Sequence, residues 1–291
     1  MPAGANPSPP AESPFPAVAC SDPVPYLAFA PDEVCAARKS VVLEGAYPFW
    51  VNSRHWLTVL CSPTKLRYFA LGFLYNEGII ATPADVLDVY IAHQPEHTIR
   101  VVLKERRVRL PRHPTLTGDC GGGITFVDLA AARRPVHSAR RLPASQIQHL
   151  MTNLLACIAP LYQTIGGFHT AALSNGDDLL AIATDIGRHN TLDKIAGECL
   201  ARGIPMEDAV LLTTGRISAQ MLGKVARMHV PIVATINSPT HLAIELAQSW
   251  NITLIGYARG ATMHLYTGAW RIQADASLLA SRPAAVSPSP S

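Results

Sequence analysis

The sequence predicts an α/β protein with a smaller α+β part toward its N-terminus. Between residues 209 and 257, short apolar runs alternate with helical patterns, an order typical of parallel βαβ units. Between about 39 and 112, strand-like runs surround a single apolar helical pattern. Hydrophobic residues make up 48% of the 291 residues and charged residues 15%, so the chain can bury a sizeable core.

Composition divides the chain into five stretches. We expect a disordered Pro/Ala/Ser-rich leader at 1–38, the smaller α+β part at 39–112, and a connection with a glycine-rich loop at 113–142. An α/β ligand-binding domain at 143–272 and a disordered tail at 273–291 complete the prediction. The N-terminus shows no secretory signal pattern, and no apolar run reaches the length of about 18 residues of a membrane span. Six scattered cysteines without a signal favour a reduced, cytoplasmic protein.

In the smaller part we expect strands at 40–43, 56–60, 86–91 and 98–103. Ser62 and Pro63 predict a helix start, with Ser62 as the N-cap and Pro63 at the first helical position. Apolar residues then recur at helical spacing up to Leu74, and Gly78 ends the pattern.

In the larger part, the capping-box pattern that begins at Ser145 predicts a helix. Strands at 168–173 and 179–184 follow, and then a helix that Asn190 caps and Gly203 ends. The alternation continues with strands at 209–213, 232–236 and 253–257. Helices lie between these strands at 218–228 and 239–250, the second capped by Ser238.

Four loops follow strands at the edge where the strands of an α/β sheet end: 185–190, 213–216, 237–240 and 257–260. Ligands of such sheets bind at the carboxyl ends of the strands. Arg188, Arg216 and Arg259 lie in three of these loops, beside glycines or helix starts, which suits phosphate. The sequence thus favours a nucleotide or pyrophosphate ligand, although ordinary turns with solvated arginines remain the alternative. The glycines match neither a dinucleotide fingerprint nor a P-loop.

Cys120 is followed by three glycines, which predicts an exposed and mobile loop. A thiol in such a loop can reach a partner's active site, whereas most cysteines are buried and inert. We expect Cys61, Cys157 and Cys199 to be buried and inert. A stray cysteine in a glycine-rich loop is the alternative for Cys120, and the neighbouring Asp119 would tend to raise the pKa of its thiol.

The histidines are weaker candidates for site residues than Cys120. His189 lies beside Arg188 in the predicted ligand edge and is a better candidate than His169, although a lone histidine is more often structural. No Cys/His cluster has zinc-ligand spacing, and the GxSxG elbow of serine hydrolases is absent. A formal charge of +3 with dispersed basic residues does not predict nucleic-acid binding.

Several segments carry a family resemblance in their order along the chain. The most specific is Asp-Ile-Gly-Arg-His-Asn at 185–190, followed by Leu-Asp-Lys at 192–194. The others are the segments 70–74, 77–80, 120–123, 169–172, 214–218, 238–240, 256–260 and 266–267. From about Val41 to Ile272 the chain resembles the FdhD/NarQ family of formate dehydrogenase accessory sulfurtransferases.

The resemblance implies a sulfur carrier. Such a protein takes sulfur as a cysteine persulfide from a cysteine desulfurase. It transfers this sulfur to the bis-molybdopterin guanine dinucleotide cofactor of molybdenum or tungsten, which formate dehydrogenase needs. The resemblance also implies a cytidine deaminase-like α/β/α sandwich, a homodimer and no dedicated metal site. Membranes and nucleic acids are not implied as partners.

Carried over by position, Cys120 matches the family's persulfide cysteine and is the expected catalytic residue. The cofactor-binding segment of the family matches Tyr257, Ala258, Arg259, Gly260, Ala261 and Thr262. Matching motifs also contain four residues that we expect near the guanine-nucleotide end: Arg188, His189, Arg216 and Ser238.

One position departs from the family pattern. Many members have Cys-Gly-x-Cys in the loop, and Gly123 stands here in place of the second cysteine. A single thiolate is enough to carry a persulfide, so transfer stays possible without a relay inside the loop. The motifs of zinc deaminases are absent. Two alternatives remain, a cofactor-binding chaperone without sulfur chemistry and an enzyme that uses His189 as a general base.

Overall fold

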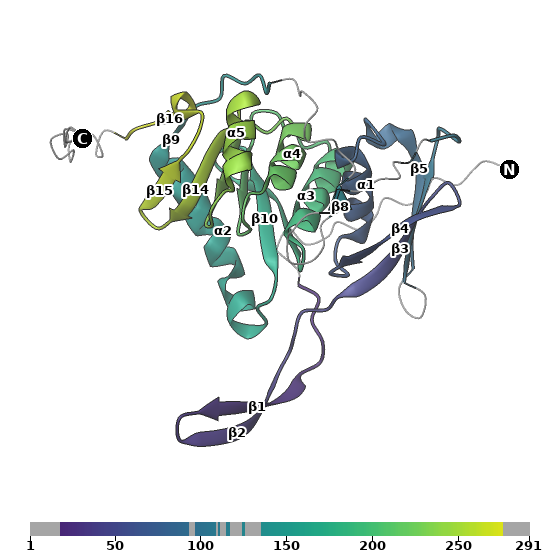
Figure 1. Cartoon of the computed structure of the whole chain (residues 1–291), viewed down its shortest axis with the longest axis vertical. Helices are drawn as coiled ribbons and strands as arrows, with labels where there is room; N and C mark the ends of the chain where they lie inside the picture. The colour runs from purple at the N-terminus through teal and green to yellow at the C-terminus, as the bar shows by residue number, and fades with distance from the viewer. Residues whose placement is uncertain are drawn as a thin grey trace.

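The computed structural model describes residues 18–92, 97–108, 110, 115–116, 124–125 and 135–275. These residues form stacked layers (Figure 1). Helix α2 (Ala144–Thr164) covers one face of a six-stranded sheet, and α3 (Arg188–Arg202), α4 (Ala219–Arg227) and α5 (His241–Ser249) cover the other. Helix α1 (Leu66–Asn76) packs on α3 and separates it from a four-stranded sheet.

The six-stranded sheet has the order β11-β10-β12-β13-β14-β15. Its strands are β10 (His169–Ser174), β11 (Leu179–Asp185), β12 (Val210–Thr213), β13 (Ile232–Thr235), β14 (Thr253–Arg259) and β15 (Thr262–Leu265). Strands β12, β13 and β14 are parallel, as the alternating pattern predicts. Strand β10 lies antiparallel between β11 and β12, and β15 is antiparallel at the edge. The sheet is therefore mixed, with its carboxyl edge unaffected by the inserted strand.

Alternating side chains of the sheet build two separate cores. Leu211, Val233 and Leu254 face the layer of α3, α4 and α5. Leu212 and Ile255 face α2, whose buried residues recur at helical spacing. The predicted apolar face of this helix is confirmed, because Ile147, Leu150, Met151, Leu154 and Ile158 are all buried.

The four-stranded sheet has the order β4-β3-β6-β5. It contains β3 (Gly45–Val51), β4 (Arg54–Cys61), β5 (Val86–Ala92) and β6 (Thr98–Leu103). Tyr47 and Phe49 of β3 are fully buried against α1. The remaining strands are short: β7 (Thr115–Leu116) pairs with β8 (Ile124–Thr125), and β9 (Leu142–Pro143) pairs with β16 (Ile272–Gln273). Two 3₁₀ turns lie at Pro83–Asp85, before β5, and at Ala269–Arg271, before β16.

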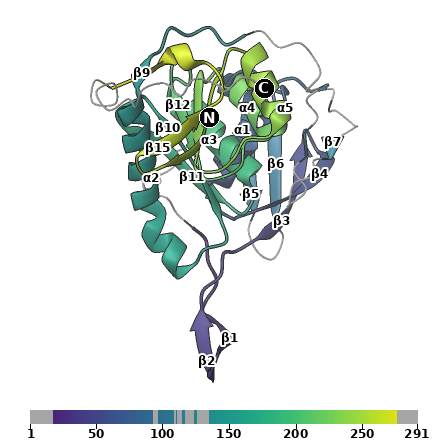
Figure 2. The same ribbon diagram turned by 60° about the vertical axis from the view of Figure 1, so that its left-hand side comes forward.

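A hairpin of β1 (Val24–Ala30) and β2 (Glu33–Lys39) stands away from the layers in both views (Figures 1 and 2). All of it except Lys39 lies in the stretch 1–38 that composition predicts to be disordered. The two strands pair over seven positions from Val24 to Lys39, although the Pro/Ala/Ser content of the whole stretch is typical of disorder. Both faces are exposed, with Tyr26 at 46% on one and Phe29 at 77% on the other.

Helices α1 and α3 cross with their backbones in direct contact. A Cβ atom at Gly72 would lie 1.8 Å from the carbonyl oxygen of Asp193, and one at Gly197 would lie 1.8 Å from that of Tyr68. Only glycine at both positions permits this approach. The crossing joins the four-stranded sheet to the six-stranded one.

Most predicted elements are present, but several predicted caps are wrong. Helix α1 begins at Leu66, because Ser62 instead donates its backbone N–H to Asp185. Ser145 bonds to Asp275 rather than closing a capping box. Asn190 lies inside α3 and binds Asp185. Thr240, not Ser238, caps α5, because the segment before it pairs with Ile217.

The strand predicted at 40–43 is also wrong, since Val42 forms only an isolated bridge with Cys20. Strand β3, central in its sheet, was not predicted. The expectation of a mixed α/β protein is confirmed, whereas the cytidine deaminase-like arrangement stays a prediction. Within the described ranges, no helix is both long and apolar enough to cross a membrane.

Replacing Gly197 by alanine will destabilise the protein by about 3 kcal/mol, because the added methyl group overlaps the Tyr68 carbonyl and forces the helices apart. Chemical denaturation measures the loss. Ala201→Ser adds one atom to an exposed position of the same helix and will change the stability by less than about 0.5 kcal/mol. Equal stability of Gly197→Ala and the wild type would contradict the close crossing.

Candidate functional site

The strands place the predicted loops on one edge of the six-stranded sheet. Thr213 at the end of β12 lies opposite Thr235 at the end of β13, and Ala234 lies opposite Ile255 of β14. Asp185 at the end of β11 lies opposite His169 at the start of β10. The loops after β11, β12, β13 and β14 therefore leave the sheet from the same side.

Contacts between successive loops make this edge continuous. A Cβ atom at Gly215 would lie 2.9 Å from Cβ of Arg188, so the loop after β12 rests on the start of α3. Ile217 pairs with the segment at Ser238, whose carbonyl accepts its N–H at 3.2 Å. The Tyr257 N–H donates to the Asn237 carbonyl at 3.0 Å. From β11 to β14 the edge spans four strand spacings, about 19 Å.

Asp185 organises the first loop. Its carboxylate accepts hydrogen bonds from the Ser62 and Gly187 backbone N–H groups at 3.1 and 2.8 Å and from the Asn190 amide at 2.9 Å. Nζ of Lys194 lies 2.6 Å from the same carboxylate, and both side chains are fully buried. The loop 185–190 thus has a fixed backbone, with Arg188 and His189 at the first two positions of α3.

A second buried ion pair joins the helices behind the edge. Lys224 of α4 contacts the Asp193 carboxylate of α3 at 2.5 Å. Asn76 of α1 donates to the same carboxylate at 2.7 Å. Three helices therefore share one carboxylate, one helical turn from His189.

His189 is held in the neutral state. Burial, followed by the positive charges of Lys224 and Arg188, lowers the pKa of His189 to about 2. Burial and the Arg188 charge also lower the pKa of His169. An imidazole with a pKa of about 2 is a poor proton acceptor at neutral pH. This counts against an enzyme that uses His189 as a general base.

The three arginines of the edge differ in exposure. Arg188 is buried, whereas Arg216 and Arg259 are exposed. Nε of Arg259 donates to the Ile236 carbonyl at 2.8 Å, which turns the side chain back over the end of β13. Ser238 is half-buried in the loop after β13, which lies between the loops that carry Arg216 and Arg259. The exposed guanidinium groups can reach an anion outside the protein.

The segment Tyr257–Thr262 forms the turn between β14 and β15. Tyr257 has φ 51° and Gly260 has φ 55°, so the chain takes left-handed conformations twice in four residues. Ala258 is buried in the core beneath α2, and the Ala261 carbonyl accepts from Gln148 at 2.7 Å. Tyr257, Arg259, Gly260, Ala261 and Thr262 are exposed. The turn is anchored at both sides while its outer surface stays accessible.

Cys120 lies outside the described residues, in the segment between β7 and β8. Among the other cysteines, Cys61 and Cys199 are buried, and burial raises the pKa of both thiols, that of Cys199 to about 12. Cys157 is exposed on α2, so its predicted burial is wrong. In the part of the chain that the structure describes, no three His, Cys, Asp or Glu residues gather to hold a metal ion.

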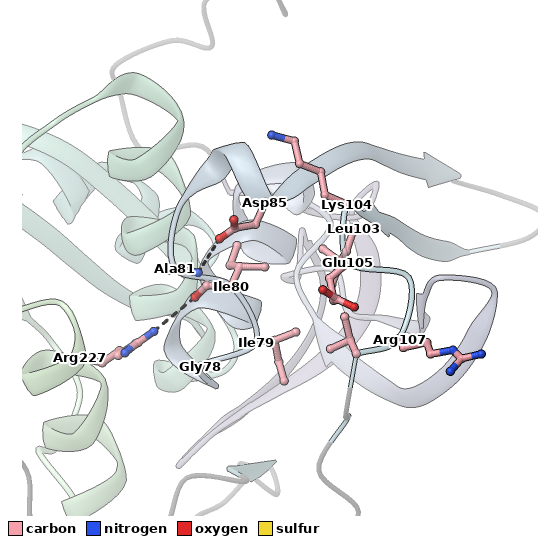
Figure 3. A pocket seen from close by; sticks show the side chains of 11 residues that line it. Gly78, Ile79, Ile80, Ala81, Asp85, Leu103, Lys104, Glu105, Arg107 and Arg227 are labelled. Atoms are coloured by element: carbon pink, nitrogen blue, oxygen red, sulfur yellow. Dashed lines mark hydrogen bonds between the residues drawn. The ribbon is translucent and has the colours of Figure 1, made fainter.

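A hollow of about 670 Å³ lies away from this edge, between α1, β6 and α4 (Figure 3). Ile79, Ile80 and Leu103 line it, and Lys104 and Arg107 extend outward. Arg227 donates to the Ile80 carbonyl at 3.3 Å. The lining of this hollow contains none of the predicted site residues.

Sequence reasoning assigned no role to Lys194, Asp193 or Gln220, which are almost fully buried. Lys194 and Asp193 belong to the Leu-Asp-Lys segment that follows the most specific motif. The sequence signal for Asp193 and Lys194 is that they are charged and lie among apolar residues of one helix. Charged side chains that are buried must be paired, so each of them needs a partner of opposite charge. Pairing partners cannot be identified before the fold is known.

Asp185→Asn will lower the free energy of unfolding by about 3 kcal/mol, because it leaves the Lys194 ammonium buried without a counter-charge. Adding Lys194→Met removes that charge and will restore part of the loss. Urea denaturation of both single variants and the double variant measures the coupling. Simple additivity of the two substitutions would contradict a direct buried pair.

The lowered pKa of His189 makes stability depend on pH. The unfolded chain binds a proton near pH 6.5 and the folded chain does not, so stability is complete above pH 6.5 and falls as the pH drops below it. Between pH 7 and 5 this imidazole alone costs about 2 kcal/mol. Thermal unfolding of His189→Gln will show a weaker pH dependence, and the exposed His241→Gln will match the wild type. Identical slopes for all three proteins would contradict the buried neutral state.

Comparison with known proteins gives a consistent result. The family model described as "FdhD/NarQ family" matches residues 42–273. The chain is 34% identical over 240 residues to a sulfur carrier protein FdhD of Staphylococcus haemolyticus, covering 81% of this chain and 90% of that protein. A sulfur carrier protein FdhD of Shouchella clausii is 33% identical over 250 residues, covering 83% and 91%.

The fold is also similar to a solved structure. A crystal structure described as a formate dehydrogenase accessory protein from Desulfotalea psychrophila superimposes with a TM-score of 0.69 and 24% identity. The match covers 87% of this chain and 100% of that one. Because the family model spans nearly all of the layered structure, the resemblance drawn from the motifs is confirmed, and the chain belongs to the FdhD/NarQ family.

Proposed function

We propose that this chain is a sulfur carrier that serves formate dehydrogenase. It takes sulfur as a persulfide on Cys120 from a cysteine desulfurase and transfers it to the bis-molybdopterin guanine dinucleotide cofactor. The observation that carries the proposal is the continuous edge of about 19 Å with exposed arginines, in a chain whose curated relatives are named sulfur carriers. We further propose a homodimer in the cytoplasm.

The first step is a thiol–disulfide type exchange. The Cys120 thiolate attacks the outer sulfur of the desulfurase persulfide. The bond between the two sulfurs of the donor breaks, and the donor cysteine leaves as a thiolate. In the second step, the sulfur–sulfur bond of the Cys120 persulfide breaks and Cys120 returns as a thiolate. The two electrons that convert the transferred sulfur to sulfide come from the reduced metal of the acceptor.

The length of the edge and its hydrogen-bond donors suit the cofactor that accepts the sulfur. A single phosphate would occupy a few ångströms, whereas about 19 Å accommodates an extended dinucleotide. Helices α3, α4 and α5 all begin at this edge and present backbone N–H groups there. Arg216 and Arg259 add guanidinium groups that make bidentate contacts with phosphate. Ser238 lies in the loop between those of Arg216 and Arg259, and the turn Tyr257–Thr262 contains Arg259 itself.

The remaining thiols are poor alternatives to Cys120. Cys61 and Cys199 are buried with raised pKa values, so neither forms the thiolate that attacks a sulfur donor. Cys157 is exposed on α2, on the face of the sheet opposite α3, α4 and α5. It therefore serves as the matched control for reactivity.

Cys120→Ser will abolish sulfur loading, because serine cannot form a persulfide. The measurement is mass spectrometry of the intact protein after incubation with a cysteine desulfurase and cysteine. We expect a gain of one sulfur atom, reversed by reductant, in the wild type and in Cys157→Ser. A protein that gains no sulfur beside an active desulfurase would refute the carrier role.

The chaperone alternative is tested by activation of formate dehydrogenase. A carrier needs both Cys120 and the cofactor edge, so Cys120→Ser and Arg259→Ala will each reduce activation. If Cys120→Ser activates normally while Arg259→Ala does not, the protein holds the cofactor without sulfur chemistry.

A further inference from the structure

Gln220 has a buried amide that the protein leaves unpaired. The residue is 2% exposed and lies in the first turn of α4, directly after the loop that carries Arg216. Neither Oε1 nor Nε2 has a hydrogen-bond partner among the residues that the structure describes. A buried polar group without a partner costs about 1–3 kcal/mol, so such a group needs an explanation.

Helical spacing fixes the direction of the Gln220 side chain. Lys224 lies one turn further along α4 and contacts Asp193 of α3. His189 lies one turn before Asp193 on α3, so Gln220 and His189 lie on facing sides of the two helices. Both strands before these helices run the same way, and side chains on a helix lean toward its N-terminus. The amide and the imidazole are therefore directed at the ligand edge.

The character of this position differs from the rest of the edge. His189 is neutral, and the amide of Gln220 has no charge. The cations near them are buried, Arg188 at the start of α3 and Lys224 in its ion pair with Asp193. The exposed guanidinium groups of Arg216 and Arg259 lie nearer the ends of β12 and β13. Phosphate suits the arginines, whereas a neutral amide pairs with an uncharged group that presents a donor beside an acceptor.

We propose that Gln220 binds the heterocyclic end of the ligand, through the edge of a ring that carries an N–H group next to a carbonyl. This inference rests on the proposed function and deepens it by assigning the two ends of the ligand to different parts of the edge. Guanine and pterin both present such an edge. A ligand bound there satisfies the Gln220 amide, and its phosphates extend along the edge toward Arg216 and Arg259.

The test measures binding by calorimetry with the full chain and three probes: guanosine diphosphate, pterin-6-carboxylate and pyrophosphate. Gln220→Met keeps the length of the side chain and removes the amide. We expect it to weaken binding of guanosine diphosphate, of the pterin, or of both by about 10-fold or more. Pyrophosphate affinity will stay the same. Which heterocycle loses affinity identifies the group that Gln220 contacts.

The matched control is Gln248→Met, the same substitution at an exposed position of α5, which will leave all three affinities unchanged. Thermal unfolding adds a second readout: removing an unpaired buried amide will not lower the melting temperature of Gln220→Met. Unchanged heterocycle affinity in Gln220→Met, an equal loss for pyrophosphate, or no binding of either heterocycle to the wild type would overturn the proposal.

Sulfur loading of wild-type Cys120 is measured in the same preparation. Normal loading together with heterocycle binding that is independent of Gln220 refutes this inference alone. Binding that depends on Gln220 without any loading of Cys120 refutes the proposed sulfur transfer alone. The two failures are thus distinguishable.

Discussion

The fully buried pair of Asp185 and Lys194 is the contact on which the functional edge depends. Lys194 also donates to the carbonyl groups of Ser62 and Thr184, and Asp185 accepts the Ser62 N–H, so one ion pair joins β11, α3 and the entry to α1. Burying two charges is costly, and only a complete set of hydrogen bonds offsets the cost. These hydrogen bonds are complete only when both sheets are in place, because Ser62 follows β4 of one sheet and Thr184 lies in β11 of the other. Formation of the loop 185–190 is therefore tied to assembly of the whole structure.

The crossing of α1 and α3 and the ion pair of Lys224 with Asp193 also fix α3 against the rest of the structure. Gly72 and Gly197 bring α1 and α3 close enough for Asn76 to reach Asp193, which also binds Lys224. Each contact involves groups far apart in sequence. Because α3 is fixed from three sides, its first turn has a defined position, and binding at the edge does not require ordering of this helix. Such pre-organisation reduces the entropic cost of binding.

The layered architecture could be predicted because it depends on local patterns, such as the βαβ alternation after residue 209 and the apolar face of α2. The caps at Ser62, Asn190 and Ser238 could not, because tertiary partners take up the groups that a local cap would use. Strand β3 was missed because Gly45 and Pro48 interrupt its pattern. Convergence of the ligand loops followed from strand direction alone, whereas the unpaired amide of Gln220 depends on the packing of two helices.

The positively charged side chains near the edge are of two kinds, buried lysines and exposed arginines. The two buried lysines, Lys194 and Lys224, are each paired with a buried aspartate, so they add little net field outside the protein. Their effect is local: Lys224 helps to keep His189 uncharged. Arg216 and Arg259 are exposed, so the attraction for an anion is concentrated there. A ligand with a neutral ring at one end and phosphates beyond it fits this division, since placing phosphate beside Gln220 would leave its neutral amide without a matched partner.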